Sequence, residues 1–316
     1  MNKSRNWPVA VIVLLAIGLA GMAYQHFKFG EERKDFERRW NLTAAQLHNL
    51  SIVSDVPSDI NFIPAKEGSG YVQLSGKLKS EIVRKLSQTE PASDGLQLDL
   101  SSDSFSIFSF DFRSTKSQIT VALPEGLELG RFQLDLKSGG GSVRGVRAGQ
   151  ADLKTSSGRL VVSDVKAAQI NLHSSSGKIT AEQLEGTLTA ATSSGGMSLT
   201  RISGDGTYTL SSGHLNGTGI TGHVAIQTSS GDVTLSQFSG SGQIASSSGS
   251  ITLSGQRSDS LNITARSGNV KLSKDDAFRG IYNLRTSSGS IHAPDSPGQT
   301  HDVIEVRTRS GNITIR

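Results

Sequence analysis

The sequence predicts an all-β protein whose main body is a parallel β-solenoid, a rod in which the chain winds through successive coils of short strands. Three observations predict this fold class. A Ser-Gly pair recurs at ten places, with spacings of 18 to 22 residues. Apolar and polar residues alternate on both sides of each pair. A repeat of this length is too short for a βαβ unit, which needs about 30 residues.

The repeat is best defined by its glycines, each of which follows a serine. The residue five positions before the glycine is apolar in all ten coils, as at Leu153, Ile226 and Val306. Alternation with a period of two is typical of strands with one buried face, so each coil of residues 139–316 should contain two short strands joined by a Ser-Ser-Gly turn. The ten glycines are Gly139, Gly158, Gly177, Gly195, Gly213, Gly231, Gly249, Gly268, Gly289 and Gly311.

Small residues three positions before the glycine predict a crowded corner inside the rod. We expect the turn serines to be structural, with hydroxyls that bond to neighbouring turns in a ladder, since a catalytic serine repeated in every coil makes no chemical sense. The corner residues are Thr155, Ser174, Thr192, Thr228 and Ser246.

Residues 51–138 lack this repeat and predict a β-rich region that leads into the solenoid and caps its first coil. A short helix is expected at Ser80–Leu86. Short alternating segments predict strands near Leu50–Val53, Tyr71–Leu78, Leu96–Leu100, Phe105–Phe112 and Ile119–Leu123.

The N-terminus contains an uncharged run from Trp7 to Phe27. Its apolar centre, Val9–Tyr24, would extend about 24 Å as a helix, slightly less than the hydrocarbon core of a bilayer. We therefore expect residues 1–28 to form a signal-anchor transmembrane helix, in a single-pass membrane protein whose C-terminal part is extracytoplasmic. The alternative is a cleaved signal peptide, with Gly21-Met22-Ala23 as the cleavage site, and a secreted protein.

The segment that follows is predicted to be a juxtamembrane helical stalk over residues 29–50. Phe36, Trp40 and Leu47 would lie near one face of that helix.

Composition excludes several classes of function. The 316 residues include no cysteine, which excludes a disulfide scaffold, a thiolate metal site and a cysteine nucleophile. Residues 1–138 contain 16 basic and 16 acidic groups, and residues 139–316 contain 16 and 12. This excess is too mild for a nucleic-acid footprint, so no nucleic-acid partner is expected.

The order of segments now supports a specific resemblance. A strand followed by proline, Ile119-Thr-Val-Ala-Leu-Pro124, precedes Phe132-Gln-Leu-Asp-Leu-Lys-Ser-Gly139 and the run of Ser-Ser-Gly coils. Over about residues 50–316 the chain resembles the bacterial "putative adhesin" family of β-strand-repeat proteins found in cell-envelope stress operons. With its N-terminal apolar run, it is similar to the membrane-anchored members encoded beside antibiotic-responsive envelope regulators in Gram-positive bacteria. The family has no established catalytic residues, so the resemblance implies none here.

Glycine-containing segments of the repeat resemble nucleotide- or calcium-binding motifs, but none of them predicts such a site. Gly217-x-Gly219-x-x-Gly222 matches the letters of the dinucleotide fingerprint, but a strand pattern follows where a helix is required. His223 stands where a phosphate loop needs lysine. Gly204-Asp205-Gly206 is an isolated fragment of a calcium-binding repeat.

Titratable residues likewise predict no catalytic, cofactor or metal site. The seven histidines show no metal-ligand spacing, and His173 and His214 are expected on the surface. Asp275 and Asp276 are adjacent, so their side chains would diverge in a strand, and a solvated loop is expected instead.

These observations favour a non-enzymatic cell-envelope protein: a membrane-anchored solenoid whose polar face contacts wall polymers or envelope proteins, in adhesion or in the envelope stress response that the resemblance implies. One alternative is a carbohydrate-active enzyme on a β-helix, which three or more acidic or basic groups converging on one groove would favour. The other is an accessory protein that contacts a membrane stress sensor through residues 1–50.

The C-terminal coil is expected to be the open end of the rod, because the sequence stops inside a strand pattern at Asn312-Ile-Thr-Ile-Arg316. Ile304, Val306, Ile313 and Ile315 would then occupy core positions with no coil beyond them. We expect weak self-association or addition of a partner strand at this end.

Overall fold

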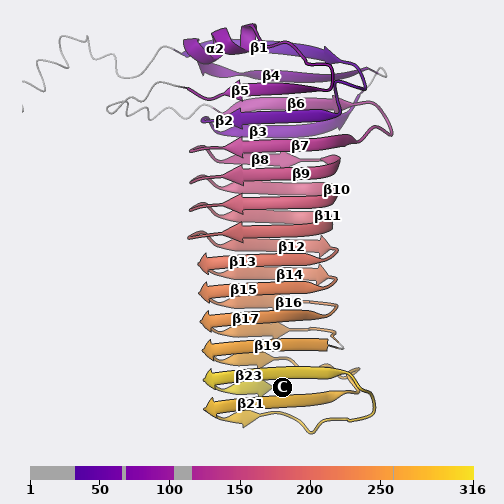
Figure 1. The fold of residues 1–316 in the computed structure, drawn as a ribbon, viewed down its shortest axis with the longest axis vertical. Coiled ribbons are helices and arrows are strands. Elements are labelled where there is room, and N and C mark those ends of the chain that lie inside the picture. Colours follow the sequence, from indigo (N-terminus) through magenta and orange to yellow (C-terminus); the bar gives the residue numbers. More distant parts are fainter. Residues whose placement is uncertain (1–32, 66–68, 103–115, 259) are drawn as a thin grey trace, which may run out of the picture.

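The computed structural model describes residues 33–65, 69–102, 116–258 and 260–316. They form a rod of stacked parallel strands with one short helix near the N-terminal end (Figure 1). The predicted parallel β-solenoid of about ten coils is therefore confirmed. Within the described residues, no helix has the length and apolar character needed to cross a bilayer. The predicted transmembrane segment, residues 1–28, lies outside the described residues.

The elements of the N-terminal part contribute strands to both sides of the rod. They are β1 (Arg33–Leu42), β2 (Asn49–Ser54), β3 (Ser58–Pro64), β4 (Gly70–Lys79), α2 (Ser80–Ser87), β5 (Gly95–Leu100), β6 (Ser117–Leu123), β7 (Leu129–Leu136) and β8 (Gly141–Arg144). The strands predicted near Leu50, Tyr71, Leu96 and Ile119 are present as β2, β4, β5 and β6, and the predicted short helix is α2. The strand expected at Phe105–Phe112 lies outside the described residues.

The repeat region continues with strands of three to fifteen residues, except for the two-residue β22. They are β9 (Arg147–Thr155), β10 (Leu160–Ser174), β11 (Ile179–Thr192), β12 (Met197–Ser203), β13 (Gly206–Ser212), β14 (Leu215–Thr221), β15 (Val224–Ser230), β16 (Val233–Ser236), β17 (Gly242–Ser248), β18 (Ile251–Ser254), β19 (Ser260–Ser267), β20 (Val270–Leu272), β21 (Ile281–Ser288), β22 (Ile291–His292), β23 (Val303–Ser310) and β24 (Ile313–Ile315).

Two sheets face each other along the rod and share the long strands β10 and β11. The first sheet runs β1-β4-β6-β3-β8-β10-β11-β12-β14-β16-β18-β20-β24-β22. The second sheet runs β5-β2-β7-β9-β10-β11-β13-β15-β17-β19-β23-β21. Pairing is parallel throughout, apart from the antiparallel pairs β1–β4 and β4–β6.

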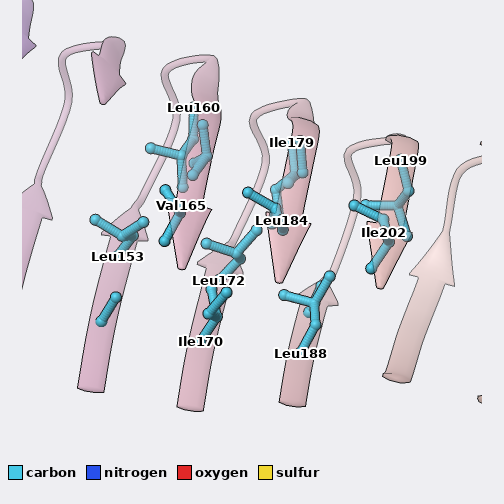
Figure 2. Packing of buried hydrophobic residues seen from close by; sticks show 14 of the residues in the cluster. Leu153, Leu160, Val165, Ile170, Leu172, Ile179, Leu184, Leu188, Leu199 and Ile202 are labelled. Atoms are coloured by element: carbon cyan, nitrogen blue, oxygen red, sulfur yellow. The ribbon is translucent and has the colours of Figure 1, made fainter. Parts of the chain in front are cut away.

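Stacked columns of apolar side chains fill the space between the sheets (Figure 2). In one coil, Leu160 and Val165 point inward from the first sheet, and Ile170 and Leu172 point inward from the second. Parallel register places each of them against its counterpart in the next coil, as Leu160 lies against Ile179. Burial of this core provides the main driving force for folding, at about 25 cal/mol for each Å² of apolar surface removed from water.

Two features turn the chain at the ends of each coil. The predicted interior corner is confirmed, since Thr155, Ser174, Thr192, Thr228 and Ser246 are all buried. A second corner lies where the chain passes from a strand of the first sheet to the next strand of the second sheet. One residue at this corner has φ between 52° and 82°, and in four coils that residue is not glycine. These residues are Gly145, Asp164, Gln183, Arg201, Gly219, Gln237 and Gly255.

The Ser-Ser-Gly turns stack through their backbones. The amide of Ser176 donates to the carbonyl of Ser156 at 2.8 Å, and similar bonds join later turns. A Cβ on Gly231, whose φ is 129°, would lie 1.8 Å from the carbonyl oxygen of Gly213, so only glycine fits. Among the described residues, a turn-serine hydroxyl bonds to a neighbouring turn at Ser138, which donates to the carbonyl of Asp55 at 3.4 Å. The later turns are held by their backbone amides, so the expected continuous ladder of serine hydroxyls is not present there.

At the N-terminal end, β2 and β3 are each flanked on both sides by strands that come later in the sequence. β2 lies between β5 and β7, and β3 lies between β6 and β8. Helix α2 contacts β5, β1 and β4 and buries Ile82 and Leu86.

The prediction of a helical stalk over residues 29–50 was wrong where the chain is described. Residues 33–42 form strand β1, paired antiparallel with β4. Phe36, Arg38 and Trp40 share the inner face of this strand, and the indole N–H of Trp40 donates to the carbonyl of Thr89 at 2.9 Å. The inward-facing residues of this segment therefore recur at every second position, as in a strand. Pairing with β4 stabilises the strand over the predicted helix.

At the C-terminal end, the last coil in the sequence is the second to last in space (Figure 1). β23 lies between β19 and β21, and β24 lies between β20 and β22. The expectation that the C-terminal coil is the open end was wrong, because this arrangement buries all four of its core residues. These are Ile304, Val306, Ile313 and Ile315. The outermost coil is β21–β22, where Ile281 and Ile291 are 43% and 41% exposed.

Candidate functional site

The outward face of the second sheet changes character along the rod. Four positions before each turn glycine, the middle coils present small or neutral side chains, namely Ala191, Thr209, Gln227 and Ala245. The same column presents Arg307 and Arg285 in the last two coils. The distal end of this face is therefore strongly basic.

The predicted surface histidines are confirmed as exposed, and one belongs to a structural column. Nδ1 of His214 accepts a bond from the amide of Asp232 at 3.2 Å, and Asp232 accepts one from the amide of Ser250 at 2.8 Å. Asn269 and Asn312 repeat this contact further along the rod, at 2.9 Å. These side chains tie successive turns together. His173 is exposed in the second sheet.

The glycine motifs lie at corners of the solenoid. Gly219 has a φ of 66° at the end of β14, and Gly222 precedes β15, so no helix follows the dinucleotide-like letters. In the calcium-like fragment, Asp205 accepts a bond from the amide of His223 at 2.9 Å. This aspartate therefore links two coils.

The acidic pair lies in the loop between β20 and β21, as expected. Asp275 accepts a bond from the amide of Ala277 at 2.9 Å, and Asp276 lies 3.0 Å from Lys274. Across the described ranges, no group of three or more His, Asp or Glu side chains is placed to hold a metal ion.

Asp152 is the centre of a polar cluster on the second sheet. Burial alone would raise the pKa of Asp152, but hydrogen bonds from Asn171, Arg131 and Gln150 outweigh burial and hold this pKa below its ordinary value. The distances are 2.7 Å from Asn171 and 2.7 Å from Arg131. The donors lie on β7, β9 and β10, and all of them bond to the Asp152 carboxylate. The cluster therefore links three neighbouring strands of the second sheet.

Tyr208 is an unusual core residue because its hydroxyl is sealed in the apolar interior. The side chain is fully buried, and its Oη has no hydrogen-bond partner. Gly206 leaves the space that the hydroxyl occupies. Burial raises the pKa of Tyr208. The side chain is 0% exposed, so the hydroxyl does not reach the surface.

The most distinctive surface feature is a hollow of about 430 Å³ that we call the arginine groove. It crosses β15, β17, β19, β23 and β21, and its floor contains small residues such as Ser229 and Ser247. Arg266, Arg307 and Arg309 form its basic end, and Arg285 lines an adjoining hollow that shares Arg307. All four arginines are exposed.

A groove with three or more acidic or basic groups was the feature expected to favour a carbohydrate-active enzyme, and four arginines lie in this groove and the adjoining hollow. Arginine side chains, however, do not provide acid–base catalysis. A guanidinium stays protonated at all physiological pH values and takes up no proton, and polysaccharide hydrolysis ordinarily needs a pair of carboxylates. The carboxylate beside the groove, that of Glu305, accepts bonds from Asn283 at 2.9 Å and from Arg307 at 2.5 Å. The groove is thus equipped to bind anions.

Sequence reasoning missed this groove, although one signal for it was present. Arginine occupies the position two before the turn glycine at Arg266 and Arg309, where seven of the ten coils have serine. That departure from the repeat marks two coils, but only the spatial order of the coils shows that they are neighbours.

The fold and surface define a two-sheeted parallel β-solenoid with a basic distal groove. The chain belongs to the Toastrack DUF4097 family, which it matches over residues 47–237 and 217–316. The expected kinship with β-strand-repeat proteins described as adhesins is confirmed. No curated protein matches the chain.

Several solved structures are similar in part. A "putative adhesin" of Bacteroides fragilis is 17% identical, with a TM-score of 0.39, over 76% of this chain and 97% of that one. A "putative cell adhesion protein" of Clostridium sporogenes is 9% identical, with a TM-score of 0.28, over 89% and 99%. A "putative lipid binding protein" of Parabacteroides distasonis is 16% identical, with a TM-score of 0.38, over 89% and 96%.

Proposed function

We propose that this protein is a non-enzymatic contact protein of the bacterial cell envelope. In this proposal, the apolar segment near the N-terminus holds one end of the rod at the membrane, and the rod extends outside the cell. Its outward faces contact a wall polymer or an envelope protein, in adhesion or in the response to envelope stress.

The single observation that supports this proposal best is the polarity of the rod along its axis. The described chain begins in β1 at one end, and the arginine groove lies at the opposite end (Figure 1). Fourteen strands are stacked in the first sheet, which at about 4.8 Å per strand gives a length of about 60 Å. A membrane-held rod of this length would carry its basic end well beyond the lipid headgroups.

Rigidity supports a spacer role as well. Neighbouring coils are joined by backbone bonds in both sheets and in the turns, so bending the rod would break many bonds at once. Side chains that tie coils together, such as Asp152 and Asp232, add to this stiffness.

The first experiment is co-sedimentation of the full chain, in neutral detergent, with purified bacterial cell walls. We expect the protein to pellet with the walls, and release by salt would indicate a charged contact. Bovine serum albumin serves as the non-binding control. A full chain that stays in the supernatant with walls and also with membrane-protein extracts would overturn the contact function.

The second experiment addresses location. Cells that express the full chain are fractionated, and the intact protein is expected with the membrane and accessible to protease added outside. Recovery from the medium of a shortened protein that starts at Tyr24 would instead support signal-peptide cleavage.

A further inference from the structure

We propose that the arginine groove binds a phosphate-bearing polymer. This inference deepens the proposed envelope-contact function, since it names the chemical class of the ligand and the residues that hold it. Three arguments support it: the stacking of like charges, the scarcity of neutralising groups, and the match between the donors and the oxygens of phosphate.

The four arginines lie on three neighbouring strands in two columns. Arg307 of β23 is directly opposite Arg285 of β21. On the other side of β23, Ala265 pairs with Thr308 and Ser267 pairs with Ser310. Arg309 therefore lies opposite Arg266 of β19. Strand spacing of about 4.8 Å and a rise of about 3.3 Å per residue confine all four Cα atoms to a patch of about 10 by 7 Å.

Such stacking of like charges destabilises a sheet unless a counter-charge is present. In several other coils the protein pairs opposite charges instead, as in Lys166–Glu185 at 2.7 Å and Arg131–Asp152 at 2.7 Å. Of the four groove arginines, Arg307 is the one whose guanidinium pairs with Glu305. No carboxylate of the described chain lies within ion-pair distance of Arg266, Arg285 or Arg309. The charge of these three groups is thus available to a ligand.

The donor geometry favours phosphate over carboxylate. Each guanidinium presents a planar fork of donors that takes up two oxygens at once. A carboxylate holds its two oxygens in one plane and turns both to the same side, which suits a single fork. The non-bridging oxygens of a phosphate in a polymer diverge from a tetrahedral phosphorus, so they can accept from two arginines, one on each neighbouring strand. Paired arginines such as Arg266 and Arg309 therefore suit a phosphate between them.

The shape of the groove favours a chain over a single ion. It extends across five strands, about 19 Å, from the arginines toward Ser229 on β15. Its floor is formed by small hydroxyl and methyl side chains, which leave room for a thin polymer and offer hydrogen bonds to it. A polymer with phosphates at regular spacing would engage both arginine pairs at the same time.

The test measures binding of labelled inorganic polyphosphate to the full chain in neutral detergent. The first variant is Arg266→Ser with Arg309→Ser, which restores the serine that most other coils have at this position. The second is Arg285→Thr with Arg307→Thr, which introduces threonine, the residue that two other coils have at this position, as Thr209 and Thr264. We expect each double variant to bind about tenfold more weakly or worse. The slope of log affinity against log salt should fall by about one for each arginine removed.

A matched control removes the same charge elsewhere. Arg159 and Lys178 are exposed and lie opposite each other at the start of another pair of strands, since Leu160 pairs with Ile179. The variant Arg159→Ser with Lys178→Ser should bind polyphosphate like the wild type. The melting temperature of both arginine variants should equal or exceed that of the wild type, because repulsion is relieved, so that lost binding cannot be attributed to unfolding.

Three results would overturn the proposal: equal binding by the arginine variants, an equal loss in the Arg159–Lys178 control, or binding of polyglutamate as tight as that of polyphosphate. The results that contradict the proposed envelope-contact function differ from those that contradict the phosphate-binding groove. Arginine-dependent polyphosphate binding without wall or extract binding would contradict only the envelope contact. Wall binding that persists in both arginine variants, together with equal polyphosphate binding, would contradict only the groove.

Discussion

Ile263 of β19 and Val306 of β23 are direct neighbours in the second sheet, although 43 positions separate them in the sequence. Leu284, which is closer to Ile263 in the sequence, lies one strand further out, against Val306. The chain therefore passes over one coil position when it forms β21–β22 and then returns to fill the gap with β23–β24. An equivalent insertion at the other end places β2 between β5 and β7. The strand pairs β2–β3 and β23–β24 are thereby held on both sides.

This order predicts a contrast between two equivalent core positions. Val306→Asp should lower the free energy of unfolding by about 3 kcal/mol or more, because it buries an unpaired charge between two coils. Leu284→Asp, in the same position of the half-buried outermost coil, should cost less than about 1 kcal/mol. Chemical denaturation measures both. A larger loss for Leu284→Asp would mean that the coils are stacked in their sequence order.

The buried hydroxyl of Tyr208 has no hydrogen-bond partner, so a side chain without this hydroxyl should make the protein more stable. Tyr208→Phe should raise the free energy of unfolding by about 1 kcal/mol, because it removes a buried donor without a partner. Tyr282→Phe, at a half-buried ring, serves as the control and should change little.

The same residue predicts a dependence on pH. Burial raises the pKa of Tyr208 in the folded state, so above the ordinary value of 10.0 the unfolded state loses this proton first. The wild type should therefore lose stability as the pH rises through 10, and Tyr208→Phe should lose less. Equal slopes for the two proteins would show that the hydroxyl is not sealed.

Asp152 predicts the opposite dependence, at low pH. Its pKa is lower in the folded state, so its carboxylate stabilises the protein above the ordinary value of 3.8, and this contribution is lost as the pH falls through the folded-state pKa. Asp152→Asn should cost about 1 kcal/mol at neutral pH, since the partner Arg131 is partly exposed, and almost nothing in strong acid. Melting temperatures across this range provide the measurement, and a constant difference would contradict the assignment.

Strand β1 predicts where a shortened protein remains stable. A fragment of residues 31–316 should fold, whereas one of residues 45–316 lacks β1, leaves the edge of β4 unpaired and loses the buried indole of Trp40. The shorter fragment should melt at a lower temperature and aggregate more readily. Identical melting and light scattering would show that β1 adds nothing to the fold.

Local features of this fold were predictable from sequence because they repeat. Period-two alternation predicted the strands, and small residues at a fixed position predicted the buried corner at Thr155 and its equivalents. β1 was missed because Arg38 interrupts the apolar pattern on its inner face. The guanidinium of Arg38 lies over Trp40, with its carbon 4.9 Å from the ring centre. It donates hydrogen bonds to the carbonyl of Leu86 and to the carboxylate of Glu90.

The order of the coils was not predictable, because any coil of this repeat presents the same edge to its neighbours. Longer spacings of 21 and 22 residues near the end supply the extra chain for a return crossing, but they do not specify one. The arginine groove depends on that order. If coils were stacked in sequence order, Arg266 would lie beside Ser287, and Arg309 would have no arginine next to it.

The order of the last three coils is thus the central claim, and disulfide trapping tests it most directly, since the natural chain contains no cysteine. Thr264 lies opposite Arg307, within the Cα distance of about 4.4 to 6.8 Å that a disulfide spans, whereas Arg285 lies two strands from Thr264, about 9.6 Å away. On mild oxidation of the full chain, the Thr264→Cys/Arg307→Cys variant should form an intramolecular disulfide, and the Thr264→Cys/Arg285→Cys variant should retain free thiols. The reverse result, a disulfide only in the second variant, would contradict the coil order and the groove that depends on it.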